Sequence, residues 1–163
     1  MVRAAPEMLF ETMDDHHWLA SHMTGRSAMM AGSAMSVEID GLGGRAVGSR
    51  IAMRGKVLGL RLQLVEAVVQ RDPPLFKAWE TVGEPRLLVI GRYRMGFAIA
   101  PVAGGSRVTM FIDYDDPAPP WRWLGRLAGG AYARWCVRAI VEGTVNAFDA
   151  PRPPAGDAGG PAA

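Results

Sequence analysis

The chain has 163 residues, of which 49% are hydrophobic and 21% are charged, and its formal net charge is +2. A chain of this length fits one domain that can bury a core without disulfides or a structural metal. The 18 basic and 16 acidic residues are interspersed, so there is no basic tract of the kind that follows a nucleic-acid backbone. Because the chain has one cysteine, the composition excludes a fold held together by several disulfides. It also gives no support to nucleic-acid binding.

The sequence also bears on the compartment. No apolar run reaches the roughly 18 residues that a membrane-spanning helix needs. The first 15 residues contain acids where a signal peptide would need an uninterrupted apolar core. The single cysteine, Cys136, lies in an apolar helical run and is interpreted as a small buried residue. We expect a cytoplasmic protein without a transmembrane segment, either monomeric or homodimeric.

Two short helices are predicted near the N-terminus. Pro6 suits the first turn of a helix, and Glu7 faces the positive end of the helix dipole. The stretch HHWLASHM follows two aspartates and predicts a second short helix or turn that carries Trp18. Residues 24–33 are rich in Gly, Ser and Met and are predicted to form a loop.

Alternation of apolar and polar residues then predicts about six strands. The predicted strands cover residues 33–40, 45–56, 60–71, 76–82, 87–102 and 107–114. Pro73 and Pro74 in the turn at residues 72–74 end the third strand because proline cannot donate to a ladder, and residues 83–85 are predicted to turn the chain. Short connections, including a hairpin at Gly104–Gly105, predict an antiparallel meander.

The last periodic run, residues 119–148, predicts the one helix long enough to lie across the whole sheet. Its apolar residues share one face up to Gly129–Gly130 and a different face afterwards. This change predicts a kink or a separate lead-in helix, in which Trp121 and Leu124 face inward on a flap. One domain is expected over residues 1–150, followed by a disordered tail rich in Pro, Gly and Ala at residues 151–163.

This order of segments resembles that of the START-like, or Bet v 1-like, superfamily, which includes polyketide cyclase/dehydrase and lipid-transport domains. The resemblance covers residues 4–148 and rests on the order of the stretches APEMLFETMDD, GLGGRAVGSR, VEAVVQRDPPLFKAWE, GGSRVTMFIDY and LAGGAYARWCVRAIVEGTVNAF. It implies an α+β helix-grip fold, in which a curved antiparallel β-sheet wraps around the long C-terminal α-helix. Members usually have a full strand before the first helix, whereas only residues 1–5 precede it here, so we expect that strand to be short or missing.

The resemblance also implies an apolar cavity between sheet and helix, in which members hold lipids, sterols, polyketides or other hydrophobic molecules. The inward strand positions alone fit either a cavity wall or a close-packed core, and the resemblance favours the cavity. The expected ligand is a hydrophobic small molecule, bound without a cofactor. Its predicted contacts are Trp18, Met35, Val37, Ile51, Met53, Leu62, Leu64, Tyr93, Met95, Met110, Ile112, Tyr114, Trp121 and Leu124.

Five polar residues are candidates for acid–base chemistry in the cavity. Tyr93 and Tyr114 lie on the inward faces of long strands, where a buried hydroxyl seeks a partner. Glu66 is in register with the apolar residues of its strand, so it either points inward with a raised pKa or reaches water at the strand end. His16 or His17 near a cavity mouth could act as an acid or a base.

A metal site is not expected. His16, His17 and His22 lack the spacing that places two ligands on one helix face, so we predict that they are polar surface residues. Arg92 and Arg94 alternate with Tyr93 and are predicted to lie on the solvated outer face of the sheet.

Three functions remain open from the sequence. The first is a protein that binds or carries a hydrophobic small molecule. The second is an enzyme of the cyclase/aromatase or dehydratase type, and the third is a protein-interaction module. The lack of an acid–base pair with unambiguous inward facing favours the first function, although one scaffold can host all three.

Overall fold

The computed structural model describes residues 1–24, 35–57 and 59–149 and places them in one antiparallel sheet and three helices. Consecutive strands are neighbours throughout the sheet, as a meander requires. In chain order the elements are α1 (Pro6–Met13), α2 (His16–Thr24), β1 (Met35–Ile39), β2 (Arg50–Val57), β3 (Leu60–Asp72), β4 (Phe76–Arg86), β5 (Tyr93–Val102), β6 (Gly105–Tyr114) and α3 (Arg122–Asp149).

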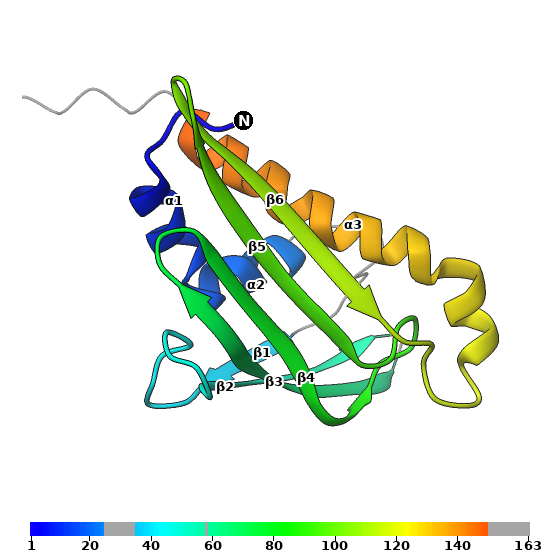
Figure 1. The fold of residues 1–163 in the computed structure, drawn as a ribbon. Coiled ribbons are helices and arrows are strands. Elements are labelled where there is room, and N and C mark those ends of the chain that lie inside the picture. Colours follow the sequence, from blue (N-terminus) through cyan, green and yellow to red (C-terminus); the bar gives the residue numbers. More distant parts are fainter. Residues whose placement is uncertain (25–34, 58, 150–163) are drawn as a thin grey trace, which may run out of the picture.

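The sheet curves around the helices. Figure 1 shows β5 and β6 standing beside α3, while β1, β2 and β3 fold underneath and α2 lies behind β5. Apolar residues of all three helices meet the sheet in one buried cluster that includes Leu9, Leu19, Phe97 and Ile140. This arrangement confirms the predicted α+β helix-grip fold.

A second buried cluster lies at the other end of the sheet. It consists of Ile51, Met53, Leu64 and Val68 from β2 and β3. The period of two brings these side chains to one face, because Ile51 pairs with Glu66 and Met53 pairs with Leu64 across the ladder. The sheet therefore has one core under the three helices and a smaller one under β2 and β3.

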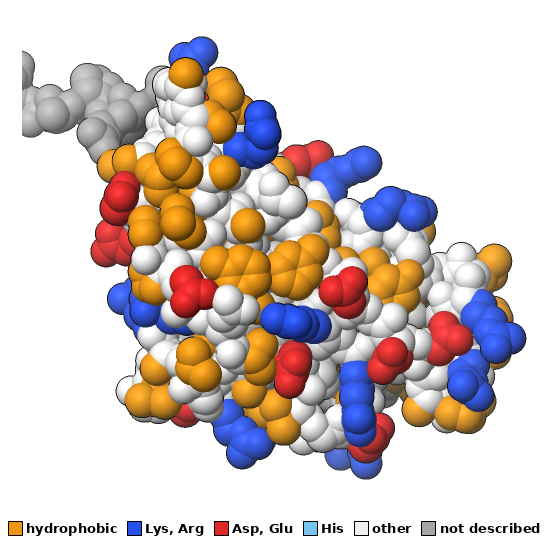
Figure 2. All heavy atoms as spheres, viewed as in Figure 1, with side chains coloured by type: hydrophobic (Ala, Val, Ile, Leu, Met, Phe, Trp, Pro, Cys, Tyr) orange, Lys and Arg blue, Asp and Glu red, His pale blue; other side chains and the backbone are white. Residues whose placement is uncertain are grey.

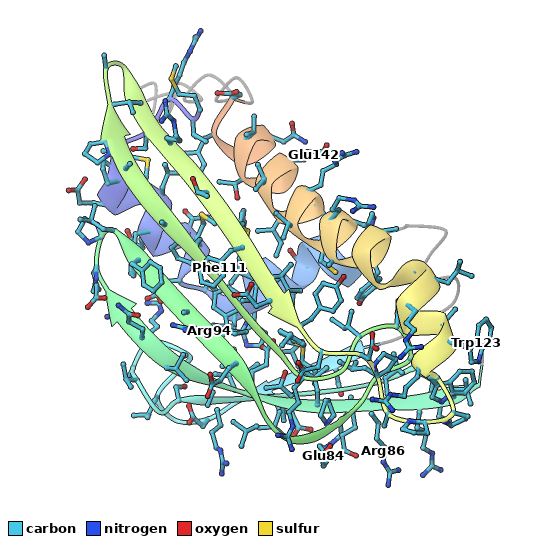
Figure 3. All side chains as sticks on the ribbon, turned by 45° about the vertical axis from the view of Figure 1, so that its right-hand side comes forward. Glu84, Arg86, Arg94, Phe111, Trp123 and Glu142 are labelled. Carbon is cyan, nitrogen blue, oxygen red and sulfur yellow. The ribbon has the colours of Figure 1, made fainter. Side chains whose placement is uncertain are left out.

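Charged side chains are spread over the surface. Figure 2 shows Lys and Arg interspersed with Asp and Glu over the viewed face, in agreement with the absence of a basic tract in the sequence. Arg94 on β5 is exposed, as predicted, and so is Arg92 just before the strand (Figure 3).

Two strand boundaries were predicted wrongly in the middle of the chain. The strand β4 does not turn at residues 83–85 but continues to Arg86, with Gly83 at a φ of 74°. It can continue because β3 is long enough to pair with it up to Gln63, after a register shift. Conversely, residues 87–92 are not part of β5, because Gly91 donates its backbone N–H to the Asp115 carbonyl at 2.7 Å and bends the segment toward β6.

The start of β2 was also predicted too early. Residues 45–49 form a loop, and Val47, which the alternation placed inward, is 61% exposed. The loop is closed by Ser49, whose hydroxyl donates to Asp40 at 2.6 Å and accepts the backbone N–H of Gly44 at 2.9 Å. A serine that bonds to the local backbone in this way competes with strand pairing.

The first strand is reduced to a single bridge, as expected. Val2 and Ser106 exchange two backbone hydrogen bonds of 2.9 Å in an antiparallel bridge. The prediction of one domain over residues 1–150 stays a prediction. The predicted loop at residues 24–33 lies outside the described residues except for Thr24, which ends α2, and the tail at residues 151–163 also lies outside them.

The long helix is continuous, so a separate lead-in helix is wrong. Figure 1 shows that the first turns of α3 bend away from the axis of the rest, which agrees with the kink alternative. Trp121 and Leu124, which were predicted to face inward, are partly buried, whereas Leu127 in the next turn is 79% exposed. Gly125 and Gly129 are buried and face inward instead. A Cβ at position 125 would lie 2.2 Å from Pro117 Cδ, so no residue larger than glycine fits there.

Candidate functional site

A cavity lies between the inner face of the sheet and α3. Its volume is about 70 Å³, measured as the space open to the centre of a water-sized sphere. The walls come from β2, β3, β5, β6, α3 and the segment before β5. The lining residues are Met53, Leu62, Leu64, Leu87, Ile90, Tyr93, Met95, Ile112, Tyr132, Trp135 and Cys136.

The structure brings together some of the predicted ligand contacts and adds others. Six residues from the predicted set line the cavity: Met53, Leu62, Leu64, Tyr93, Met95 and Ile112. The sequence reasoning missed Leu87 and Ile90 because it placed them in a strand. It also missed Tyr132, Trp135 and Cys136, although the second apolar stripe of the helix contained two of them.

Other predicted contacts lie away from the cavity. Ile51 and Val37 belong to the cluster under β2 and β3, while Trp18 and Met110 belong to the larger core at α1 and α3. Tyr114 is 37% exposed at the end of β6. Alternation chose the correct face for these strand residues, but it cannot tell a core position from a cavity position on that face.

The remaining predicted contacts lie at the ends of elements. Trp121 precedes α3 and accepts the backbone N–H groups of Leu124 and Gly125 at its carbonyl, which begins the helix. Trp121 and Leu124 are partly buried but do not line the cavity. The side chain of Met35 falls outside the described part of the chain.

Glu66, which is buried, and Tyr93, which is partly buried, form a pair beside the cavity. The Tyr93 hydroxyl donates to Glu66 Oε1, and Tyr93 itself lines the cavity. Glu66 is only 1% exposed, so the alternative that it reaches water at the strand end is wrong. Its second oxygen, Oε2, has no hydrogen-bond partner among the described residues.

Burial raises the pKa of Glu66 to about 7, although the hydrogen bond from Tyr93, the nearby indole of Trp79 and the charge of Lys77 oppose the rise. Burial and the neighbouring carboxyl raise the pKa of Tyr93, so its hydroxyl keeps its proton. Near neutral pH the pair therefore holds a carboxyl group that can gain or lose a proton and a phenol that relays its hydrogen bonding to the cavity.

His16 is buried rather than exposed, which corrects the prediction of a surface residue. It is 2% exposed, its Nδ1 lies 3.3 Å from Lys77 Nζ, and its ring meets Trp79 edge to face at 5.2 Å. Burial and the charge of Lys77 lower the pKa of His16 to about 3. His16 is therefore neutral at pH 7, while His17 is exposed at the first turn of α2.

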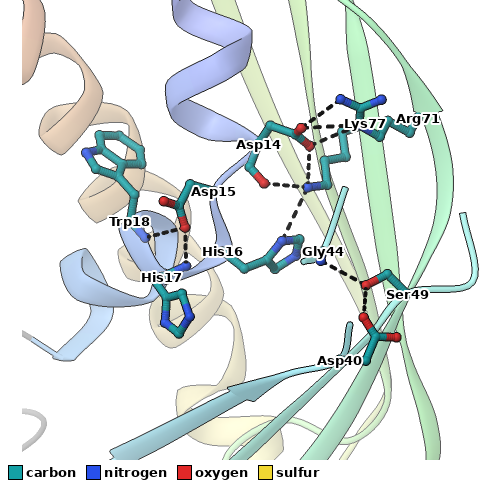
Figure 4. Close-up of polar contacts among 10 residues, drawn as sticks. All are labelled: Asp14, Asp15, His16, His17, Trp18, Asp40, Gly44, Ser49, Arg71 and Lys77. Atoms are coloured by element: carbon teal, nitrogen blue, oxygen red, sulfur yellow. Dashed lines mark hydrogen bonds and ion pairs between the residues drawn. The ribbon is translucent and has the colours of Figure 1, made fainter. Parts of the chain in front are cut away.

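Lys77 is the polar residue that the sequence reasoning missed. It is fully buried, and its ammonium donates to Asp14 Oδ1 at 2.6 Å and to the Asp14 carbonyl at 2.8 Å (Figure 4). Arg71 donates to the other Asp14 oxygen at 2.8 Å. The only signal in the sequence was that Lys77 shares a strand face with Trp79, which points inward.

The two cations of this cluster hold its one carboxylate in the charged form. Burial raises the pKa of Asp14, but the hydrogen bonds and charges of Arg71 and Lys77 outweigh it, so that the pKa lies below its usual range. Burial lowers the pKa of Lys77, and Asp14 opposes that change. With all its donors directed at Asp14 and His16, Lys77 joins the corner between α1 and α2 to the sheet rather than facing the cavity.

Two other kinds of chemistry find no support in this site. Within residues 1–24, 35–57 and 59–149, no group of three or more His, Cys, Asp or Glu side chains is arranged to hold a metal ion. Burial raises the pKa of the Cys136 thiol to about 11, so the thiol in the cavity wall stays protonated and is a poor nucleophile.

A curved antiparallel sheet around a long C-terminal helix, with an apolar cavity between them, defines a Bet v 1-like helix-grip protein. The chain belongs to the family described as "Polyketide cyclase / dehydrase and lipid transport", which matches residues 1–150. The family assigned from the resemblance is thereby confirmed. No curated protein sequence matches the chain significantly.

Several solved structures share the fold. The protein TTHA0849 from Thermus thermophilus has a TM-score of 0.64 at 17% identity, over 89% of this chain and 90% of that chain. Truncated norcoclaurine synthase from Thalictrum flavum has a TM-score of 0.61 at 14% identity, over 93% and 90%. Ara h 8.0201 has a TM-score of 0.57 at 13% identity, over 89% and 93%. At these identities the similarity shows the fold alone.

None of the helices described here is both long enough and apolar enough to cross a bilayer.

Proposed function

We propose that the protein binds a compact hydrophobic small molecule in the cavity between the sheet and α3. The observation that carries this proposal is the cavity wall, in which apolar and aromatic side chains surround one tyrosine that a buried carboxyl group backs. Ligand sites in proteins have this composition, with few polar groups in a mostly apolar wall. Membership of a family named for polyketide chemistry and lipid transport supports the same class of ligand.

The size of the cavity argues for a compact ligand. A volume of about 70 Å³ on this measure holds roughly five water molecules, at 10–15 Å³ each. A fused aromatic ring fits such a space more easily than a long acyl chain does. Met53 and Met95 in the wall can change rotamer at low cost, so the cavity can adapt by a few atoms.

Tyr93 supplies the polar contact for such a ligand. Because its hydroxyl proton points to Glu66, its oxygen presents lone pairs to a hydrogen-bond donor on the ligand. A phenol or an alcohol on a ring system has the required donor. We therefore expect naphthol-like molecules to bind more tightly than the hydrocarbons of the same shape.

A pair of tryptophan variants tests the cavity. Leu62 lines it, whereas Leu60 lies on the same face of β3 two residues earlier, is 39% exposed and does not line it. Leu62→Trp should fill the cavity and weaken binding of 2-naphthol and of the apolar dye 1,8-ANS by at least roughly tenfold. Leu60→Trp should leave both affinities unchanged.

The measurements are dye displacement, followed by native mass spectrometry with denaturing extraction of the protein purified from its own host. Equal binding to wild type and Leu62→Trp would show that the probe sits elsewhere. If wild type binds neither probe and carries no extractable molecule, the proposal fails.

A second candidate function is proton transfer on a carbonyl compound, as in a cyclase or dehydratase. The Glu66–Tyr93 pair favours it, because the carboxyl group can accept a proton near neutral pH and the phenol can stabilise a neighbouring oxygen. A suitable assay is hydrogen–deuterium exchange next to the carbonyl of α-tetralone, followed by NMR. Glu66→Gln should abolish protein-catalysed exchange and keep binding; an unchanged exchange rate would leave the protein a binder only.

A further inference from the structure

We propose that the outer face of α3 docks on an anionic phospholipid bilayer. Trp123 and Leu127 would enter the interface between headgroups and acyl chains, and Arg134 and Arg138 would contact the phosphates. This inference adds an interaction surface to ligand binding and does not depend on which molecule the cavity holds.

The first observation is exposure. Leu127 is 79% exposed and Trp123 is 62% exposed, which places both among the most exposed large hydrophobic residues of the described chain. They are four residues apart and thus one helical turn apart on the same side. Figure 3 shows Trp123 projecting from the end of α3, away from the sheet.

The second observation is that the arginines continue the same stripe. At about 100° per residue, positions 123, 127, 134 and 138 fall within one narrow sector of the helix. The buried face, which includes Gly129, Cys136 and Ile140, lies on the opposite side. On the side that faces solvent, the helix is therefore apolar at its start and basic at Arg134 and Arg138, and Glu142 follows one turn after Arg138.

The third observation is charge. From Pro117 to Val141 the chain has four arginines and no acidic residue. Arg126 has Asp116 at 3.5 Å, but neither Arg134 nor Arg138 has a carboxylate within ion-pair distance in the part of the chain that the structure describes. Figure 2 shows apolar, basic and acidic side chains together where the first turns of α3 lie.

A lipid surface fits this combination better than a protein does. Tryptophan favours the interfacial layer of a membrane, and arginine pairs with phosphate through its planar fork. A helix with an apolar tip and basic flank lies in that layer by burying a few side chains. A stable protein interface needs about 800 Å² from each partner, which two apolar side chains on one helix cannot supply.

The position of this face also suits exchange of an apolar ligand. The inner sides of the same turns, Gly125 and Gly129, pack against the carbonyl of Val89. That residue lies between Leu87 and Ile90, which line the cavity. A membrane bound to the outer face of these turns would thus lie next to the segment that closes one end of the cavity.

Flotation of the full-length protein with vesicles tests the proposal. The vesicles contain phosphatidylcholine alone or phosphatidylcholine mixed with phosphatidylglycerol. Wild type should bind the mixed vesicles and bind phosphatidylcholine weakly. Arg134→Gln with Arg138→Gln should weaken binding to the mixed vesicles by roughly 30-fold, because each arginine near an anionic surface contributes about fivefold.

Trp123→Ser with Leu127→Ser should weaken binding to the mixed vesicles by more than roughly tenfold. Matched controls change the same residue types elsewhere on the surface. Leu42→Ser with Val47→Ser removes exposed apolar side chains, and Arg61→Gln with Arg107→Gln removes exposed charges. These controls should bind like wild type.

Three outcomes would overturn the proposal: no binding of wild type to the mixed vesicles, equal weakening by the control variants, or a dimer in analytical ultracentrifugation that Trp123→Ser with Leu127→Ser dissociates. The last outcome would assign the face to a second copy of the chain. Binding of 2-naphthol by the same variants keeps the two proposals apart, because it should not change when docking is lost.

Discussion

Lys77 is a cation held far from water by one carboxylate, one carbonyl and one neutral imidazole. Its three hydrogen-bond partners belong to Asp14 and His16 at the corner between α1 and α2. An ammonium group without such partners would lose its proton or unfold the site. The cluster therefore fixes the corner against the sheet, while the chemistry at the cavity is left to Glu66 and Tyr93.

Removal of this cation should be costly. Lys77→Met should lower the free energy of unfolding by about 3 kcal/mol, because it leaves the buried Asp14 with Arg71 as its remaining positive partner. Asp14→Asn combined with Lys77→Met should cost less than the sum of the two single changes, since no fully buried charge is then left unpaired and Arg71, which loses its partner, is partly exposed. Urea unfolding of the four proteins measures the coupling, and additive costs would contradict it.

Glu66 contributes stability to the folded protein that decreases as the pH rises from 4.5 to 7. Its pKa is about 7 in the folded protein against an ordinary value of 4.5, so the folded state holds the proton more tightly. The resulting stabilisation is complete below pH 4.5 and is lost as the pH rises to 7. Over that interval wild type should lose up to about 3 kcal/mol relative to Glu66→Gln.

Urea unfolding of wild type and Glu66→Gln between pH 4.5 and 7.5 checks this expectation. Glu80→Gln is a suitable control, because Glu80 lies on the exposed side of the neighbouring strand. Its profile should parallel that of wild type. Parallel profiles for Glu66→Gln as well would mean that the carboxyl group titrates normally.

These residues also show what a sequence can reveal at this scale. The period of two correctly allowed Glu66 to point inward, and an inward carboxyl group implies a raised pKa. The same period placed Lys77 beside Trp79, but lysine is so seldom buried that the pattern favours a solvated position. Lys77 can be buried because it pairs with Asp14, which is 63 residues away in sequence. A local sequence pattern contains no information about that pairing.

At the scale of one element, α3 owes its position to small residues. Gly125 lies against Pro117 and Gly129 lies against Tyr114 and Val89. The hydrophobic pattern did not reveal this face, because glycine has no apolar side chain and the predicted inward face was therefore based on Trp121 and Leu124. The shift of the apolar stripe at Gly129–Gly130 was nevertheless a real signal, since the axis of the helix bends near its start.

Alanine substitutions separate packing from helix propensity. Gly130→Ala should stabilise the protein by about 0.5–1 kcal/mol, because a Cβ there meets no atom closer than 3.5 Å and alanine favours helix. Gly125→Ala should destabilise it by about 1–3 kcal/mol, because its Cβ would overlap Pro117. Thermal unfolding measures both, and equal shifts would show that packing at this face does not matter.

For the whole molecule, the order of elements was predictable and the cavity was only partly so. Alternation, prolines and glycines located the strands and helices, and their order was sufficient to assign the family. The wall of the cavity includes Leu87 and Ile90 from an irregular segment, which Gly91 holds against β6 by a backbone hydrogen bond. Such contacts arise from tertiary structure and leave no periodic trace.

The buried ionisable groups together shape the acid stability of the protein. The pKa of His16 is about 3 when folded against an ordinary value of 6.5, so its contribution is present above pH 6.5 and is lost as the pH falls toward 3. Glu66 changes in the opposite sense between pH 7 and 4.5. The two slopes, about 1.4 kcal/mol per pH unit each, should nearly cancel in that interval.

We therefore expect a plateau of stability from about pH 6.5 to 4.5 and a steep fall below it, where protonation of Asp14 adds to that of His16. Calorimetry or urea unfolding across this range measures the profile. His16→Gln should make the fall below pH 4.5 shallower. A steady decline of wild type from pH 6.5 would contradict the opposition of the two groups.

The bridge between Val2 and Ser106 has a practical consequence for handling the protein. In antiparallel pairing, a step back from Val2 matches a step forward from Ser106. Met1 is thus opposite Arg107, and a peptide fused ahead of Met1 would begin beside Val108 and run along the outer edge of β6, where Val2 makes the one bridge among the described residues. An affinity tag at that end can become a seventh strand, and proteins measured with and without it would then differ in how their sheet is completed.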